Sequence, residues 1–135
     1  MSKDIYTFLV TFGVMTILDA LWLGLIAPKF YKKHIGFIMS KKPNWIAALI
    51  FYLVFVLGLT IFVVYPGWHS NYTLLRVGLL GGLFGLVCYS TYDLTNQATL
   101  NKWPFIVTIV DLCWGTLLSA AVSMISVALF NAFIK

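Results

Sequence analysis

Residues 74–100 read LLRVGLLGGLFGLVCYSTYDLTNQATL, a long apolar run that ends in a polar stretch. A run of this length can cross the hydrocarbon core of a membrane, about 30 Å thick, as a single helix. Of the 135 residues in the chain, 61% are hydrophobic and 10% are charged. An ordinary soluble domain is about 45–50% apolar and about 25% charged, so this chain could not hide its apolar surface from water. The sequence therefore predicts an integral membrane protein.

Three further apolar runs are long enough to span a membrane. We expect spans over residues 5–27, 45–65, 74–94 and 105–130, with the third continuing to residue 100 if the polar stretch stays helical. Membrane-spanning β-strands require alternating rather than continuous apolar residues, which these runs do not show. The predicted fold is all-α: a polytopic four-transmembrane-helix bundle that forms a single domain over the whole chain.

Positive charge is shared unevenly between the two sides of the predicted bundle. The connection between the first and second spans carries Lys29, Lys32, Lys33, Lys41 and Lys42, and that between the third and fourth carries Lys102. The opposite side receives Lys3, Arg76 and Lys135. Positively charged connections tend to stay in the cytoplasm, which places both termini on the opposite side of the membrane, outside.

The net charge of +5 is better explained by lipid than by nucleic acid. The lysines adjoin predicted spans, where such residues contact anionic headgroups, and Lys32 and Lys33 are the expected contacts. Residues 30–42 mix apolar side chains with lysines, and two interpretations stay open: the segment lies flat on the inner leaflet, or it is a plain basic loop. Membrane lipid is thus the expected partner, and no nucleic acid is expected.

Three of the four acidic residues, Asp19, Asp93 and Asp111, fall within or at the edge of predicted spans. A carboxylate near the bilayer centre costs about 2.5–3.5 kcal/mol on insertion scales, so such residues usually are functional and face the bundle interior. At 1.5 Å per residue, all three lie roughly 10–12 Å from the cytoplasmic boundary. Because clustered carboxylates repel in a medium of low dielectric, we expect a binding or proton-carrying site in which one acid holds a proton.

The polar stretch around Asp93 belongs to this expected site. A helix that continues past Asp93 places Asn96 and Gln97 on the same face as the carboxylate. We expect this face to line a cavity open to the cytoplasm, and the alternative is a helix end followed by a solvated loop. Tyr89 and Tyr92 add hydroxyl groups near the same level, and Tyr92 and Asn96 are counted among the candidate site residues.

Two of these acids are each followed by a tryptophan, in Asp19-Ala-Leu-Trp22 and Asp111-Leu-Cys-Trp114. Residues at i and i+3 share a helix face, so we expect each indole to stand beside its own acid. The indole N–H can donate to a carboxylate or to a bound molecule, which makes Trp22 and Trp114 candidate site residues. On oppositely directed helices the repeated motif fits an inverted repeat, as in some transporters, or it is a coincidence.

Four glycines in the third span form two overlapping G-x-x-x-G pairs, Gly78 with Gly82 and Gly81 with Gly85. Small residues at this spacing let helices approach closely in lipid. The pattern predicts close helix packing, either within the chain or in a homodimer formed through this face.

Four short motifs stand out together: LDALWLG at residues 18–24, YDLTNQATL at 92–100, the pair Trp103-Pro104, and VDLCWG at 110–115. In these motifs the chain resembles the bacterial membrane family catalogued as domain of unknown function 2177. The resemblance covers nearly the whole chain. It implies a small polytopic inner-membrane protein, and it brings no established activity, cofactor or catalytic residue.

Three classes of function fit these residues. The first is a small transporter-like or ion- or proton-coupled binding protein that uses the three aspartates. The second is a membrane enzyme that modifies a lipid or isoprenoid, with carboxylates as acid and base or as Mg²⁺ ligands. The third is a non-catalytic assembly or sensor subunit. We favour the first, because intramembrane hydrogen bonds average only about 0.6 kcal/mol and give the third little reason to bury acids.

No metal site and no cofactor are expected. The sequence has neither a D-D-x-x-D run nor a cluster of histidines of the kind that binds iron. Its two histidines, His34 and His69, lie on opposite sides of the predicted membrane and cannot share a metal ion. An enzymatic role therefore stays open but is not favoured.

Overall fold

The computed structural model describes residues 2–134, which form a bundle of long apolar helices. In chain order the elements are α1 (Lys3–Leu25), α2 (Ala27–Ile35), α3 (Trp45–Leu59), the π-helix η1 (Thr60–Val64), α4 (Tyr65–His69), α5 (Leu74–Thr99) and α6 (Phe105–Phe133). Among the described residues, four helices are long and apolar enough to cross a membrane: Lys3–Leu25, Trp45–His69, Leu74–Thr99 and Phe105–Phe133. The predicted all-α fold with four spans is confirmed. Lys135, one of the cations counted above, lies outside the described residues.

Polar side chains mark where three of the spans begin. Ser2, Asn44 and Thr73 each precede a helix, and each side-chain oxygen accepts a hydrogen bond from the backbone N–H three residues later. Such N-caps satisfy one of the backbone donors that the first turn of a helix leaves free. Pro104 precedes α6, where its missing N–H removes no helical hydrogen bond.

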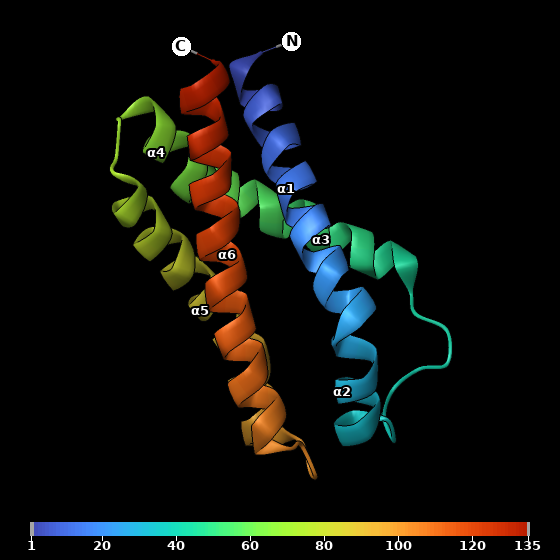
Figure 1. The fold of residues 1–135 in the computed structure, drawn as a ribbon. Helices are drawn as coiled ribbons and strands as arrows, with labels where there is room; N and C mark the ends of the chain where they lie inside the picture. Colours follow the sequence, from blue (N-terminus) through green and yellow to red (C-terminus); the bar gives the residue numbers. More distant parts are fainter. Residues whose placement is uncertain (1, 135) are drawn as a thin grey trace.

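Figure 1 shows α1 and α6 side by side and antiparallel, with α5 packed against α6 and α3 crossing obliquely behind α1. Both termini lie at one end of the bundle, which we call the terminal end. The opposite end carries α2, the connection 36–44 and the turn 100–104, and we call it the lysine-rich end. Because α3 starts partway up the bundle, α1, α2, α5 and α6 form most of the lysine-rich half.

The closest contact in the bundle joins α5 to α6 and depends on glycines. Gly78, Gly81, Gly82 and Gly85 are all buried. A methyl group at Gly81 would lie 2.7 Å from the Ser119 carbonyl oxygen, which is closer than such atoms approach in proteins. The glycine face therefore packs within the chain, and a homodimer through the same face stays a prediction that would require α6 to be displaced.

A closed ring of hydrogen bonds fixes the turn between α5 and α6. The Gln97 amide donates to the Trp103 carbonyl oxygen at 3.0 Å, and the Trp103 indole donates to the Thr108 hydroxyl at 3.1 Å. The Thr108 hydroxyl in turn donates to the Gln97 side-chain oxygen at 2.9 Å. Lys102 occupies the turn with a φ of 62°, a left-handed conformation that the ring holds in place. α5 and α6 are thus joined rigidly at the lysine-rich end.

α2 continues α1 rather than turning away from it. The Ile26 N–H bonds to Trp22 and the Phe30 N–H bonds to Ile26, so the helical hydrogen bonds run through the junction. Figure 1 shows the two helices following nearly one direction. Residues 30–35 are therefore helical, so the interpretation as a plain loop is wrong for them, and the placement of the segment on the inner leaflet stays a prediction. Only residues 36–44 form the connection to α3.

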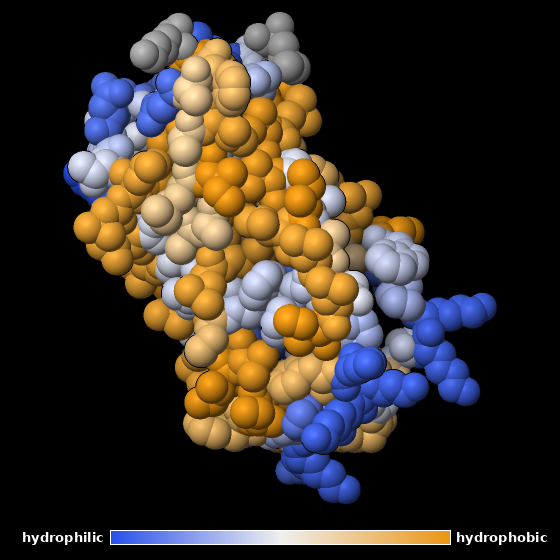
Figure 2. Space-filling view, viewed as in Figure 1, coloured by the Kyte–Doolittle hydropathy of each residue, from blue (hydrophilic) through white to orange (hydrophobic). Residues whose placement is uncertain are grey.

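The surface between the two ends is apolar. Phe62, Leu75 and Leu117, from three different spans, are each about two-thirds exposed, at 69%, 70% and 67%. Figure 2 shows the same property as hydrophobic colour over the middle of the bundle, with hydrophilic side chains gathered toward its two ends. A surface of this kind is unfavourable in water and is matched by the acyl chains of a bilayer.

Candidate functional site

Asp93 on α5 and Asp111 on α6 face each other inside the bundle. Their carboxyl groups lie within hydrogen-bonding reach of each other. Asp93 is fully buried, and neither of its carboxyl oxygens accepts a hydrogen bond from a donor among residues 2–134. A buried ionised carboxylate without a donor is costly, whereas one proton between two carboxyl groups supplies the missing hydrogen bond. The geometry therefore suits a pair that shares a proton.

A tyrosine from α2 lies against this pair. The Tyr31 hydroxyl donates a hydrogen bond to Asp111 Oδ1. Burial, and then the neighbouring Asp111 carboxylate, raise the pKa of Tyr31 above its ordinary value, so the phenol stays protonated and continues to donate. The continuous α1–α2 helix positions this side chain, with Ala27 buried against the bundle and Pro28 in the first turn of α2.

Asp19 joins the cluster through two indoles. Trp114 Nε1 on α6 donates to Asp19 Oδ1 on α1 at 3.3 Å. Trp22 stacks on Trp114, with ring centroids 4.5 Å apart and planes 13° from parallel, and it lies near the Tyr31 hydroxyl. The expectation that each indole stands beside its own acid is wrong. Because α1 and α6 lie side by side, the indoles fill the interface between them, and Trp114 finds its acceptor on the neighbouring helix.

The three acids share one buried region, and that region is closed. Asp19 and Asp111 are 7% exposed and Asp93 is fully buried, so the expected cavity open to the cytoplasm is not found. Tyr31 and the indole pair occupy the space where it was expected. The Tyr89 hydroxyl lies within electrostatic reach of all three carboxyl groups. Interior placement of the acids is thus confirmed, whereas direct access to them from the cytoplasm is not.

The polar stretch of α5 divides between the site and the surface. Asp93 points inward, and Gln97, which shares its helix face, is used in the hydrogen-bond ring. Tyr92 is 58% exposed and meets the Trp103 ring edge-on, with centroids 6.0 Å apart. Asn96 is half-buried and lies near Tyr92. Tyr92 and Asn96 therefore flank the cluster rather than contact its carboxyl groups.

Within residues 2–134 no three His, Cys, Asp or Glu side chains converge as ligands of a metal ion. Asp19 lies apart from the Asp93–Asp111 pair and bonds to Trp114 instead. The candidate headgroup contacts Lys32 and Lys33 are both exposed at the lysine-rich end, on the helix that carries Tyr31.

Two residues of the cluster and its surroundings escaped the sequence analysis. Tyr31 lies in a lysine-rich segment for which the sequence allows a membrane-surface element or a plain loop, and nothing in its neighbourhood indicates a contact 80 residues away. Thr108 lies near the start of α6, and its neighbours in the sequence are apolar, so the sequence predicts only part of a membrane span there. The nearby Trp103-Pro104 motif was the available signal, because a buried indole N–H requires an acceptor.

Comparisons with known proteins add a family and no activity. The DUF2177 family, described as a predicted membrane protein, matches residues 5–128. No curated protein matches the chain, and no solved structure matches it.

Proposed function

The chain belongs to the DUF2177 family of predicted membrane proteins, and we propose that it is a small proton-coupled, transporter-like protein whose proton is carried by Asp93 and Asp111. The proposal includes its placement in a bacterial inner membrane with both termini outside, and the distribution of lysines supports this orientation of the termini. In this function the carboxyl pair binds a proton and releases it when a cationic or polar substrate, or a conformational change, alters its surroundings.

The observation that carries the proposal is the environment of Asp93. Asp19 and Asp111 each accept a hydrogen bond from another helix, so both also join helices together. Asp93 is fully buried and accepts no hydrogen bond from the described residues. A purely structural role leaves unexplained why a carboxyl group is buried without a donor for either oxygen, whereas a proton-carrying role requires a group that no donor already neutralises.

Buried hydroxyl groups extend from the acid cluster toward the terminal end and support the same proposal. On α1, Thr11 and Thr7 follow Asp19 along the buried face, and all are inside the bundle. On α6, Ser119 and Ser126 continue the row beyond Asp111, and neither hydroxyl has a hydrogen-bond partner among residues 2–134. At 1.5 Å per residue these two serines lie about 12 and 22 Å from Asp111 along the helix. Interior hydroxyls at this spacing can pass a proton or a polar ligand when the helices move.

Proton flux through reconstituted vesicles tests the proposal. The full chain is placed in vesicles that contain a pH-sensitive dye, a potassium diffusion potential is imposed, and internal pH is followed. We expect wild-type protein to conduct protons and both Asp93→Asn and Asp111→Asn to lose most of the flux. The matched control is Asp4→Asn, which removes the one acid outside the cluster at the terminal end.

Infrared spectroscopy separates the proton-binding step from transport. A protonated carboxyl group has a C=O stretch distinct from that of a carboxylate, and we expect this band in wild-type protein at neutral pH but not in Asp93→Asn. Equal proton flux in wild type, Asp93→Asn and Asp111→Asn, or no flux in any of them, would remove the function as proposed.

A further inference from the structure

A second polar site lies at the terminal end, away from the acid cluster. A pocket of about 430 Å³ is lined by Lys3, Trp68, His69, Asn71, Asn131 and Ile134. These residues come from the start of α1, from α4 and the turn after it, and from the end of α6. The volume falls in the range of about 300–1,000 Å³ that is typical of small-molecule sites.

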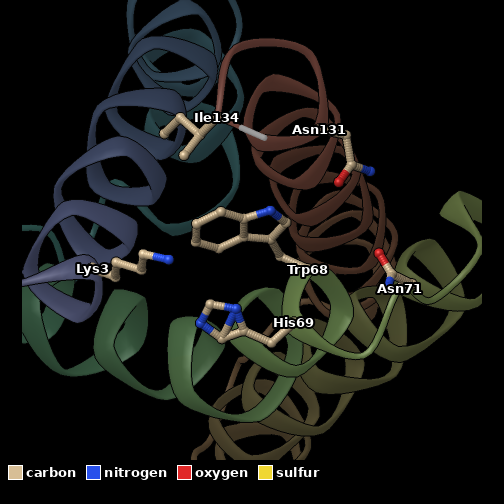
Figure 3. A pocket seen from close by; sticks show the side chains of 6 residues that line it. All are labelled: Lys3, Trp68, His69, Asn71, Asn131 and Ile134. Atoms are coloured by element: carbon tan, nitrogen blue, oxygen red, sulfur yellow. The ribbon is translucent and has the colours of Figure 1, made fainter.

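The lining of this pocket offers hydrogen-bond donors and no carboxylate. Lys3 supplies an ammonium group, Asn71 and Asn131 supply amides, and the Trp68 indole and His69 imidazole add ring N–H groups. Figure 3 shows Lys3 on one side of the pocket and the two asparagines on the other, with the rings of Trp68 and His69 between them. Donors from three parts of the chain that surround one space suit an anion with several acceptor oxygens.

The nearest acid along the chain lies outside the pocket lining. Asp4 follows Lys3 directly, but it is not among the lining residues, and it lies near the Tyr65 side chain. Tyr65 itself meets the His69 ring edge-on, with centroids 3.9 Å apart. Among the residues that line the pocket, Lys3 carries a positive charge and none carries a side-chain carboxylate.

The pocket is held in shape by packed rings and a constrained turn. Trp68 stacks on both His69 and Phe130, with centroid distances of 4.6 and 4.8 Å. Asn71 has a φ of 52°, a left-handed conformation that asparagine tolerates better than most residues. The Tyr72 N–H bonds to the Gly67 carbonyl oxygen at 2.9 Å across this turn. Strain fixed in this way is often found at ligand sites.

We infer that the terminal pocket binds the phosphate group of a ligand at the membrane surface, either a phospholipid headgroup or a soluble phosphate. A phosphate has the negative charge that Lys3 attracts and the acceptor oxygens that the two amides and the indole require. The inference is independent of the Asp93–Asp111 pair, which lies in the lysine-rich half of the bundle.

Thermal unfolding of the full chain in an uncharged maltoside detergent tests the inference, because a ligand that binds the folded state raises the unfolding temperature. Three probes are titrated: phosphatidylglycerol, inorganic phosphate, and diacylglycerol, which has the acyl chains without the phosphate. We expect a saturable rise with phosphatidylglycerol and none with diacylglycerol. A matching rise with inorganic phosphate identifies a soluble phosphate as sufficient, and its absence identifies the lipid headgroup.

Two variants locate the site and a third controls for charge. Lys3→Gln and Asn131→Asp are expected to weaken binding by about tenfold each. The first removes a charged hydrogen-bond donor, and the second adds a carboxylate that repels the phosphate. Asn131 is exposed, so its near-isosteric replacement does not threaten folding. Arg76→Gln removes the same charge at the same end, but Arg76 lies 3.8 Å above the Tyr72 ring and outside the pocket, so its affinity should match wild type. Wild-type titration curves in both pocket variants, or no saturable response to either phosphate probe, would overturn the inference.

Discussion

Replacement of two adjacent glycines by alanine should have opposite effects on stability. Gly81 and Gly82 both lie on α5, both are buried, and both belong to a G-x-x-x-G pair, so the sequence does not distinguish them. In the structure a Cβ at Gly81 would lie 2.5 Å from Ser123 Oγ and 2.7 Å from the Ser119 carbonyl oxygen. A Cβ at Gly82 would meet its nearest neighbour, Thr116 Cγ2, at 3.5 Å, which is an ordinary van der Waals contact.

The magnitude follows from the two distances. The Ser119 oxygen belongs to the backbone of α6 and cannot rotate away, so Gly81→Ala must push the helices apart by about 0.7 Å to restore ordinary contact. Overpacking of this kind costs about 1–3 kcal/mol. Both substitutions gain the same helix propensity, about 0.8–1 kcal/mol. The gain cancels between the variants, and Gly81→Ala should be less stable than Gly82→Ala by about 1–3 kcal/mol.

Unfolding of both variants by sodium dodecyl sulfate in mixed micelles, followed by circular dichroism, measures this difference directly. Wild type should fall between the two, with Gly82→Ala equal to it or slightly more stable. If the two variants unfold at the same detergent fraction, or if Gly82→Ala is the less stable, then α6 does not pack on Gly81 as described. The contact between α5 and α6 would then have to be formed by another face.

Three further predictions follow from single contacts. Thr108→Val removes the acceptor of the buried Trp103 indole and should lower the free energy of unfolding by about 1–3 kcal/mol in the same assay, with Thr99→Val, exposed on α5, as the control. Trp114→Phe keeps a ring against Trp22 but leaves Asp19 without its donor, and a loss of similar size is expected. Tyr31 should not ionise near pH 10, where ordinary tyrosines do, because burial and Asp111 raise its pKa; ultraviolet titration of wild type and Tyr31→Phe should therefore show the same phenolate absorbance there. The stability that Tyr31 contributes is present below that pH and is lost as the pH rises further, so convergence of the two unfolding curves at neutral pH would contradict the assignment.

The spans and the depth of the acids could be predicted from the sequence because both depend on one-dimensional properties. The length of an apolar run determines which segments cross the bilayer. Asp93 lies six residues before the end of α5 at Thr99, and Asp111 lies six residues after the start of α6 at Phe105. With a helical rise of about 1.5 Å per residue, both acids are the same distance from the helix ends. Burial of these acids also followed from the cost of exposing a carboxylate to lipid. None of these arguments requires knowing which helices are neighbours.

The partners of each side chain could not be predicted, because they depend on how the helices are rotated and paired. Trp114 shares a helix face with Asp111, yet it donates its hydrogen bond to Asp19. The reason is that α1, which carries Asp19, packs beside α6 at that level. Gln97 shares a helix face with Asp93, yet its side chain hydrogen-bonds to Trp103 in the following turn and to Thr108 at the start of α6. In both cases the helical spacing was correct, and the nearest competing partner lay on another element.

The contacts also indicate which part of the bundle has to move if the proposed transport is correct. The acid cluster is closed, so a proton or substrate can reach Asp93 only after some helices separate. α5 and α6 are joined by glycine packing along their length and by the Gln97 hydrogen-bond ring at their turn, which makes this pair the rigid part. The α1–α2 helix meets it at the cluster mainly through the indole stack and the Tyr31 and Asp19 hydrogen bonds. Access from the lysine-rich end should therefore come from movement of α1 and α2, with Tyr31 leaving Asp111 as the first contact to break.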